Sequence, residues 1–263
     1  MKTKKYSIER KMRILETLER EGRVEVELLA ADLRVSKETV RRDLRELEND
    51  NLLLRTHGGA VSLEMSETSP EYPEYPYLIR EIQCLEEKEK ICKRAASEIE
   101  DGDTIFIDNS STNLFILKNI NPEYSVTIIT NSIRLLLEST KYPNENFVFV
   151  SLGGIFRCKN FSCVGDIANE MSRNYRPDKA FLSCYGVNTT SGLFDSSVHE
   201  IEVKRNFIHL ARQVYLTADH TKIGRDGGFR LVDLSDVDYL ISDCMFPEEE
   251  LKNLESQHVK LLI

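Results

Sequence analysis

Beyond residue 100 the chain alternates between short apolar runs and segments of helical character, and this alternation restricts the possible folds more than any other feature. The runs are rich in Val, Ile, Leu, Phe and Tyr and span residues 104–107, 126–129, 147–150, 180–182, 214–216 and 239–241. Most of them are separated by helix-like segments, at 114–118, 132–140, 166–175 and 198–212. Apolar strands that alternate with helices are typical of a mostly parallel sheet covered on both faces. We therefore predict an α/β domain over residues 81–263.

Polar residues and glycines follow these runs, at the places where such a sheet binds its ligands. In parallel α/β sheets, ligands bind beyond the carboxyl ends of the strands. A hydroxyl-rich loop after the first run offers amides and hydroxyls to an anion, and the ammonium group of Lys222 can neutralise a phosphate. The candidate effector-binding residues are Asp108, Ser110, Ser111, Thr112, Thr130, Asn131, Gly153, Gly154 and Lys222. Each feature alone is common in caps and turns, but together they predict a site for a small phosphorylated polyol.

Apolar residues at helical spacing predict three helices in the first fifty residues. The first begins after Ser7 as N-cap and ends at Gly22. A second helix, at 26–33, is joined by a three-residue turn to a third, for which Ser36 serves as the N-cap. Residues 52–62 are predicted to form a hairpin around a tight turn at 57–59. The pattern predicts a helix-turn-helix followed by a β-wing over residues 1–62.

The outer face of the third helix is basic. Val40, Leu44 and Leu47 share its apolar face, so the cationic side chains of residues 37–45 lie on the opposite half. The whole chain has a net charge of −9, yet residues 1–60 carry 14 Lys and Arg against 12 Asp and Glu. Such a helix fits the major groove of DNA, while a wing contacts the flanking backbone. The candidate DNA-binding residues are Ser36, Lys37, Glu38, Thr39, Arg41, Arg42, Arg45, His57 and Gly58.

A simpler interpretation of this basic stretch stays open. Taken alone, a run such as Arg41-Arg42 is usually a solvated helix face. The short turn, the cap and the glycine-containing wing together favour DNA binding instead. Asp43, inside the basic stretch, is expected to pair with a nearby arginine rather than to contact DNA.

Composition and cysteine spacing exclude several other classes of protein. With 41% hydrophobic and 30% charged residues, the chain is globular rather than disordered. No segment approaches the ~18 apolar residues of a membrane span, and the charged start lacks the apolar core of a signal peptide, so a cytoplasmic protein without a membrane partner is predicted. The six cysteines lack the spacing of a metal or disulfide framework, and no metal or cofactor is predicted. Prolines within 63–80 predict a linker.

The run Val35-Ser36-Lys37-Glu38-Thr39-Val40-Arg41-Arg42-Asp43-Leu44, followed by Arg55-Thr56-His57-Gly58-Gly59-Ala60, closely resembles the DeoR family of bacterial transcription regulators. From about Glu87 to Asp243 the chain resembles the sensor domain of that family, which is similar in fold to ribose-phosphate isomerase. This second resemblance is carried by motifs at 101–103, 130–132, 152–154 and 218–222, among others. The sequence departs from the family pattern at Asn51, where a left-handed turn is expected, at Ser110 and at Cys184-Tyr185.

The resemblance implies a DNA-binding transcriptional regulator, most simply a repressor of a sugar or carbohydrate-metabolism operon that is relieved by a phosphorylated sugar or related metabolite. Co-repression or activation is the alternative sign of control. A different class of function is a sugar-phosphate isomerase, for which Asp108, Glu200 and Lys222 are the candidate acid-base and phosphate groups. An isomerase, however, needs no DNA-reading module. Because a two-fold operator requires two recognition helices, a homodimer or homotetramer joined through the sensor domain is expected.

Overall fold

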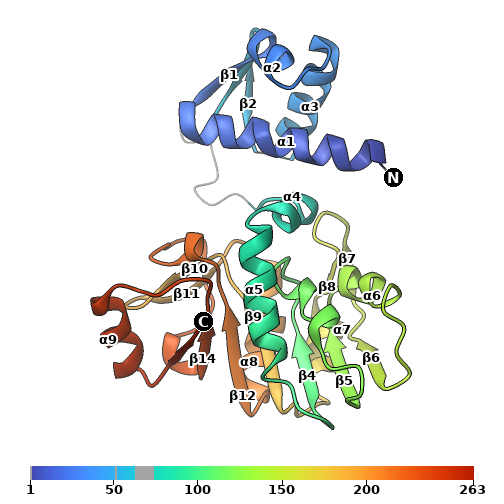
Figure 1. Ribbon diagram of the computed structural model, residues 1–263, viewed down its shortest axis with the longest axis vertical. Coiled ribbons are helices and arrows are strands. Elements are labelled where there is room, and N and C mark those ends of the chain that lie inside the picture. The colour runs from blue at the N-terminus through green and yellow to red at the C-terminus, as the bar shows by residue number, and fades with distance from the viewer. Residues whose placement is uncertain (1, 51, 63–73) are drawn as a thin grey trace. The chain divides into compact units, whose positions relative to one another are not determined.

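The computed structural model describes residues 2–50, 52–62 and 74–263 (Figure 1). The chain divides into two compact units, residues 1–83 and 84–263. The expected turn at Asn51 and most of the predicted linker, residues 63–73, lie outside the described residues.

The first unit is a helix-turn-helix with a small antiparallel sheet. The elements of its described part are α1 (Lys2–Glu21), β1 (Arg23–Glu25), α2 (Val26–Asp32), α3 (Lys37–Asn49), β2 (Leu54–Thr56), β3 (Gly59–Val61) and α4 (Tyr77–Ile82). The strands lie in the order β1-β3-β2. Val40, Leu44 and Leu47 of α3 are fully buried and form the core together with side chains of α1 and α2. The predicted helix-turn-helix and wing are therefore confirmed, while β1 was not predicted.

The predicted start of α1 is wrong. The helix begins at Lys2 instead of after Ser7, because lysines and neighbouring residues with adequate helix propensity extend it without needing an apolar face. Its end is as predicted, since Glu21 is the last helical residue and Gly22 has a φ of 71°. At the other end of the unit, α4 packs against α1, and Ile79 of α4 joins the core.

The second unit is built on a seven-stranded sheet in which every neighbouring pair of strands is parallel. The order across the sheet is β15 (Lys260–Leu262), β14 (Tyr239–Ile241), β12 (Gln213–Thr217), β9 (Lys179–Ser183), β4 (Thr104–Ile107), β5 (Val126–Thr130) and β6 (Phe147–Ser151). Six of these strands are the six predicted apolar runs. The predicted α/β fold is confirmed.

Helices cover both faces of this sheet (Figure 1). One face carries α5 (Leu85–Ala96), α6 (Ile133–Ser139) and the short 3-10 helices η2 (Asn113–Phe115) and η3 (Leu117–Asn119). The other carries α7 (Asp166–Ser172), α8 (Val198–Leu210) and α9 (Glu248–Ser256). Strand residues alternate between these two cores: Ile105 and Ile107 pack on the α5 side, whereas Phe106 stacks on Phe207 of α8 with ring centroids 4.0 Å apart.

Two smaller sheets extend from this framework. β7 (Ile155–Arg157) and β8 (Ser162–Val164) form a hairpin, and β10 (Gly186–Asn188), β11 (Gly192–Asp195) and β13 (Phe229–Arg230) form a three-stranded antiparallel sheet. Further short 3-10 helices are η4 (His220–Lys222) and η5 (Leu234–Asp236). None of these strands was predicted, because each is short and contains a polar residue or a glycine, so that it lacks a continuous apolar run.

The strand order reverses between β4 and β9, and this reversal positions the site. From β4 the chain continues to β5 and β6 on one side, whereas β9, β12, β14 and β15 fill the other side. At such a switch point the connections leave in opposite directions and open a crevice beyond the strand ends. Asp108 directly follows β4, and Ser183 is the last residue of β9.

Candidate functional site

The outer face of α3 presents cations to solvent, as the sequence predicted. Ser36 caps the helix, because its Oγ accepts a hydrogen bond from the amide of Thr39 at 3.1 Å. Ser36 is exposed and Thr39 is half-buried. The remaining candidates on this helix are all exposed, namely Lys37, Glu38, Arg41, Arg42 and Arg45.

Two of these cations are held by protein carboxylates and two are not. Lys37 pairs with Glu27 of α2, and Arg41 lies 3.6 Å from Glu38. Arg42 and Arg45 have no ion-pair partner among the residues that the structure describes. Guanidinium groups in this position are available to phosphates or to the base edges of a major groove.

Asp43 has the structural role that the sequence predicted. Its side chain is fully buried in the same helix, and it forms a two-pronged ion pair with Arg10 of α1, in which Nη2 donates to Oδ1 at 2.9 Å and Nε donates to Oδ2. The hydrogen bond to Asp43 raises the pKa of Arg10. This pair joins α1 to α3 and leaves Asp43 turned away from the exposed basic face.

The wing turn is formed by His57 and Gly58, both exposed between β2 and β3. Gly58 has a φ of 120°, which favours glycine. At Gly59 a Cβ would lie 1.9 Å from the carbonyl oxygen of Val24, so only glycine lets β3 approach β1. The wing is thus pinned at its base and exposed at its tip.

In the second unit, Asp108 organises the loop at the switch point. It is buried, and its Oδ1 accepts hydrogen bonds from the amide of Ser110 (3.0 Å) and from Nδ2 of Asn113 (2.9 Å). Its Oδ2 accepts from the amide of Ser183 at 2.9 Å and lies 3.3 Å from Nζ of Lys204. Both oxygens are therefore engaged by protein groups. These contacts hold the loop in place, and Asp108 as a ligand-binding residue stays a prediction.

Two lysines reach the hydroxyls of this loop, Lys88, which is buried, and Lys222, which is partly buried. Lys88 of α5 donates to Ser111 Oγ at 3.1 Å. Lys222 of η4 lies 3.4 Å from Thr112 Oγ1 and donates to Ser183 Oγ at 2.8 Å. Lys88 is 3% exposed, and Ser111 and Thr112 are buried. The structure thus brings together three of the predicted residues and adds a second ammonium group.

The loop that carries Lys222 is fixed by two carboxylates. Asp219 caps η4, and its Oδ2 lies 3.9 Å from Nζ of Lys222. Burial acts to raise the pKa of Asp219. The charge of Lys222 and a hydrogen bond from Thr221 lower it by more, so the pKa lies below its usual value. Asp243 accepts from both the amide of His220, at 2.7 Å, and its Nδ1, at 2.9 Å.

A second polar cluster lies beside the first and centres on Glu200 of α8. This buried carboxylate accepts from Ser162 Oγ (2.6 Å), Arg157 Nη1 (2.8 Å) and Asn131 Nδ2 (3.2 Å). Burial raises the pKa of Glu200 above its usual value, although these donors and Lys204 oppose the shift. Asn131 is 2% exposed, and its Oδ1 has no hydrogen-bond partner among the residues that the structure describes.

Lys204 connects the two clusters. Its Nζ donates to Asp195 Oδ2 (2.6 Å) and to the carbonyl of Ser183 (2.7 Å), and it lies near Asp108. Burial acts to lower the pKa of Lys204, but Asp195 and Asp108 raise it above its usual value. The ammonium therefore stays charged and ties α8 to the switch point.

The other predicted residues serve the framework. Thr130 is fully buried, and its Oγ1 accepts from the amide of Ser132 at 3.0 Å. Gly153 and Gly154 follow β6, the edge strand, three strands from β9 and thus about 14 Å from it at the usual strand spacing. A Cβ at Gly154 would lie 2.6 Å from the carbonyl oxygen of Val164, so this glycine allows β7 to leave β6 against β8. Ser110 Oγ accepts a hydrogen bond from the amide of Asn113, the first residue of η2.

The sequence analysis missed Lys88, although a signal was present. Ile91 and Ala95 lie on the buried face of α5, and Lys88 precedes Ile91 by three residues on that same face. A lysine on the buried face of an amphipathic helix needs a polar partner inside the protein. That partner is the loop at 110–112.

An exposed basic helix with a wing, in one chain with an α/β unit whose buried polar groups meet at a switch point, defines a DNA-binding transcriptional regulator. The comparisons with known proteins make this specific. Residues 10–66 match the DeoR-like helix-turn-helix domain, and residues 83–244 match the DeoR C terminal sensor domain. The chain belongs to the DeoR family, as its motifs predicted.

Relatives of similar length support this assignment. The chain is 34% identical to an uncharacterized HTH-type transcriptional regulator, YulB, of Bacillus subtilis, over 96% of this chain and 95% of that protein. It is 30% identical to the glycerol-3-phosphate regulon repressor of Escherichia coli, over 94% and 95%. It is 32% identical to the HTH-type transcriptional repressor GlcR of Bacillus subtilis, over 98% and 96%.

Part of the chain is also similar to a solved structure, ribose 5-phosphate isomerase A from Methanocaldococcus jannaschii. The TM-score is 0.38 at 19% identity, over 52% of this chain and 53% of the other. Membership of a family of regulators decides against the isomerase alternative. Among the described residues no helix is long and apolar enough to cross a membrane, and no three or more His, Cys, Asp or Glu side chains are grouped to hold a metal ion.

Proposed function

We propose that the protein is a repressor that binds operator DNA through α3 and the wing, and that releases it when a phosphorylated sugar or polyol binds at the switch point of the second unit. The observation that carries the effector half is the convergence of Lys88 and Lys222 on the hydroxyls of Ser111 and Thr112. Two ammonium groups beside hydroxyl donors suit a phosphate dianion. The relative named as a glycerol-3-phosphate regulon repressor supports the same class of ligand.

The DNA half rests on the exposed donors of the first unit. No carboxylate of the described residues pairs with Arg42 or Arg45 of α3. The same helix and its cap carry the other candidates, Ser36, Lys37, Glu38, Thr39 and Arg41. The wing tip, His57 and Gly58, would contact the backbone beside the groove. This assigns base reading to α3 and positioning to the wing.

Within the effector site we assign different roles to the predicted residues. Ser111, Thr112, Lys88 and Lys222 hold the phosphate, whereas Asp108 and Ser110 keep the loop in shape. Asn131, whose carbonyl oxygen lacks a partner, faces the remaining part of the ligand. Thr130, Gly153 and Gly154 act through the backbone that carries these groups.

The protein would act as a homodimer or a larger homo-oligomer, because a two-fold operator is read by two recognition helices. A ligand changes operator affinity only by as much as its affinity differs between the DNA-bound and free conformations. Relief of repression therefore requires that the phosphorylated ligand bind the free protein more tightly.

Operator binding in the presence of small molecules tests the proposal. DNA selected from a random pool by the wild-type chain serves as the operator, and its affinity is measured by fluorescence anisotropy with a panel of sugar and polyol phosphates. We expect one or more to weaken binding, while the dephosphorylated analogues do not. A panel without any effect on DNA affinity would contradict the effector half, and failure to select DNA would contradict the repressor.

A further inference from the structure

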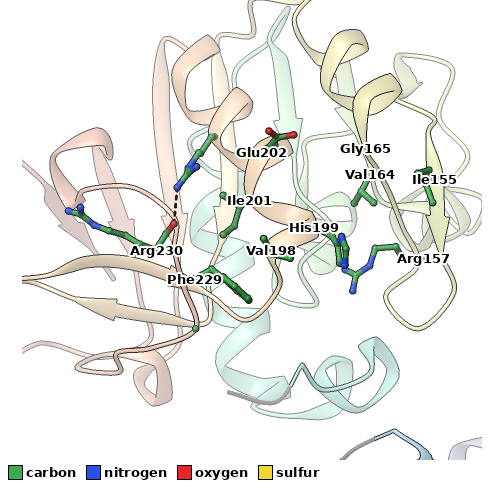
Figure 2. Close-up of a pocket in the computed structure, with 12 residues that line it drawn as sticks. Ile155, Arg157, Val164, Gly165, Val198, His199, Ile201, Glu202, Phe229 and Arg230 are labelled. Carbon is green, nitrogen blue, oxygen red and sulfur yellow. Dashed lines mark hydrogen bonds between the residues drawn. The ribbon is translucent and has the colours of Figure 1, made fainter. Parts of the chain in front are cut away.

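A groove of about 810 Å³ opens on the second unit between the β7–β8 hairpin, the first turns of α8 and β13 (Figure 2). Its wall is largely apolar, with Ile155, Val164, Val198, Ile201 and Phe229. Three of these are large apolar side chains left in water: Ile155 is 68% exposed, Val198 is 52% exposed and Phe229 is 46% exposed. Apolar residues gathered in this way mark an interaction surface.

The arginines of the groove do not make it a site for a small anion. Arg157 is bound to Glu200, and Arg230 is paired with Asp233. Arg205 donates to the carbonyl oxygens of Leu231 (2.8 Å) and Arg230 (2.9 Å), the latter bond being drawn in Figure 2. The donors of these arginines are directed to protein oxygens and not to a ligand. Arginines beside an aromatic residue such as Phe229 are typical of protein–protein interfaces.

Two charges in the groove are nevertheless not neutralised. Glu202 accepts from Asn169 Nδ2 at 2.6 Å, and Arg205 is bound only to carbonyl oxygens, so each has neutral partners. Neither forms an ion pair with any residue that the structure describes. The two lie three positions apart on α8, on the same face of the helix. This face therefore carries one unmatched anion and one unmatched cation a single turn apart.

Such a pattern is complementary to itself. If two copies of α8 pack antiparallel about a two-fold axis that passes between positions 202 and 205, Glu202 meets the partner subunit's Arg205, and symmetry supplies the reverse pair. The exposed apolar groups at the groove then cover one another. A second copy of this surface thus matches both the apolar wall and the opposite charges.

We propose that this groove is the surface through which two copies of the chain associate, with two reciprocal ion pairs between Glu202 and Arg205. The inference rests on one part of the proposed function, namely that the protein acts as a homo-oligomer. It places the contact at one surface of the second unit and fixes the direction in which the two α8 helices cross.

Sedimentation equilibrium of the full chain without DNA tests the proposal. Val198→Asp places a charge in the apolar contact, yet an acidic residue is favourable in the first turn of a helix, so the fold should be kept. At equal concentration, we expect the weight-average molecular mass of this variant in solution to be lower than that of the wild type. Leu137→Asp on α6 is the matched control, because Leu137 is also 52% exposed, and it should sediment like the wild type.

Charge reversal tests the register of the contact. Glu202→Arg and Arg205→Glu should each weaken association by about tenfold or more, since like charges then face each other twice. The double variant should recover much of the wild-type association. If the double variant stays as weak as the single ones, the proposed ion pairs are overturned.

The remaining outcomes separate the surface from the oligomer. If the wild type is oligomeric and neither Val198→Asp nor the charge reversals change its mass, the surface is wrong while the oligomer stands. If the wild type is monomeric at about 10 μM, both the oligomer and the proposed surface are overturned, because a stable interface should hold two copies together at that concentration. Circular dichroism of each variant confirms that a loss of mass is not a loss of folding.

Discussion

The two units of the chain place their charges in opposite ways. In the first unit the cations of α3 point to solvent, and the buried carboxylate Asp43 is satisfied by Arg10 alone. In the second unit one group of charges is buried near the strand ends, where Lys88, Asp108 and Lys204 are each less than a tenth exposed.

This difference matches the two kinds of ligand. A DNA duplex is a long polyanion that cannot enter a protein, so its partners must project from the surface and act through screened, salt-dependent contacts. A small phosphorylated molecule can be enclosed, and in the interior each charge-assisted hydrogen bond is stronger but each unpaired charge is costly. Buried charge in the first unit should therefore serve stability. In the second unit it should shape the site, through Asp108 and Lys204, and bind the ligand, through Lys88.

The largest effect should come from breaking the buried pair of the first unit. Asp43→Ala leaves Arg10 without its partner, which costs about 3 to 5 kcal/mol of unfolding free energy for a buried pair. Because the Arg10 side chain is 13% exposed and can regain some water, we expect a value near the lower end. Urea unfolding of the full chain, followed through the transition of the first unit, measures it.

Asp32→Ala is the matched control for this substitution. Asp32 is exposed at the end of α2 in the same unit, so its replacement should change the unfolding free energy by less than about 0.5 kcal/mol. Equal losses in the two variants would contradict a special role for the pair of Asp43 with Arg10.

The next effect concerns the lysine of the effector site. Lys222→Ala removes the proposed charge-assisted hydrogen bond to the phosphate. It should weaken binding of the active phosphorylated ligand by about 2 to 3 kcal/mol. DNA binding without ligand should be unchanged, so that the variant represses but resists induction. If the ligand is instead a co-repressor, the same variant loses repression. Isothermal titration calorimetry measures the affinity for the ligand. Fluorescence anisotropy with operator DNA shows whether the ligand weakens or strengthens DNA binding.

Lys252→Ala provides the comparison for that measurement. Lys252 is 70% exposed on α9, where it forms only a surface pair with Glu248, and surface pairs contribute little. Wild-type behaviour of Lys222→Ala toward the active ligand would show that the phosphate binds elsewhere.

A smaller effect is expected for the exposed arginine of the first unit. Arg42→Ala should cost about 1 to 3 kcal/mol of operator binding. If Arg42 contacts a phosphate, the loss is uniform among sequences and the salt dependence becomes shallower; if it reads a guanine, the loss is confined to the cognate site. Arg13→Ala on α1, also exposed, should bind like the wild type. An unchanged affinity of Arg42→Ala with an intact fold would contradict the proposed face of α3.

Much of the fold could be predicted because it depends on local patterns. The apolar runs of the seven-stranded sheet and the spacing of Val40, Leu44 and Leu47 are visible in any short window of sequence. The strands β1, β7, β8, β10, β11, β13 and β15 were missed because each has only two to four residues, at least one of them polar or glycine. They lack a continuous apolar run and form through tertiary pairing.

The residues of the proposed effector site could be inferred from the sequence only in part, for a different reason. The hydroxyl loop and Lys222 directly follow strands, so the rule for strand ends finds them. Lys88 and Lys204 reach the site from helices. Ser111 lies 23 positions from Lys88 in the chain, and the partners of Lys204, Asp195 and Ser183, lie 9 and 21 positions from it. The role of Asp108 also depended on such partners, since the amide of Ser183 occupies its second oxygen. A single sequence does not specify which distant groups meet.

The smallest predicted effect concerns pH and a group at the rim of the buried site. A hydrogen bond to Asp243 raises the pKa of His220 above its ordinary value, and the nearby carboxylates of Asp219 and Glu87 act in the same direction. Because the folded pKa is raised, the stabilisation is fully present below the unfolded value of about 6.5. It is lost as the pH rises through the folded pKa.

His220→Asn should therefore be more destabilising at pH 6 than at pH 8.5. The imidazole is half exposed, so the difference in unfolding free energy of the second unit should be only a few tenths of a kcal/mol. The first unit, whose arginines keep their charge over this range, should show no such difference, which sharpens the contrast between the two units. Asparagine keeps a hydrogen-bond donor for Asp243 but cannot become charged. Urea unfolding of wild type and variant at the two pH values measures the effect, and an equal loss at both would show that the pair contributes through its hydrogen bond rather than through its charge.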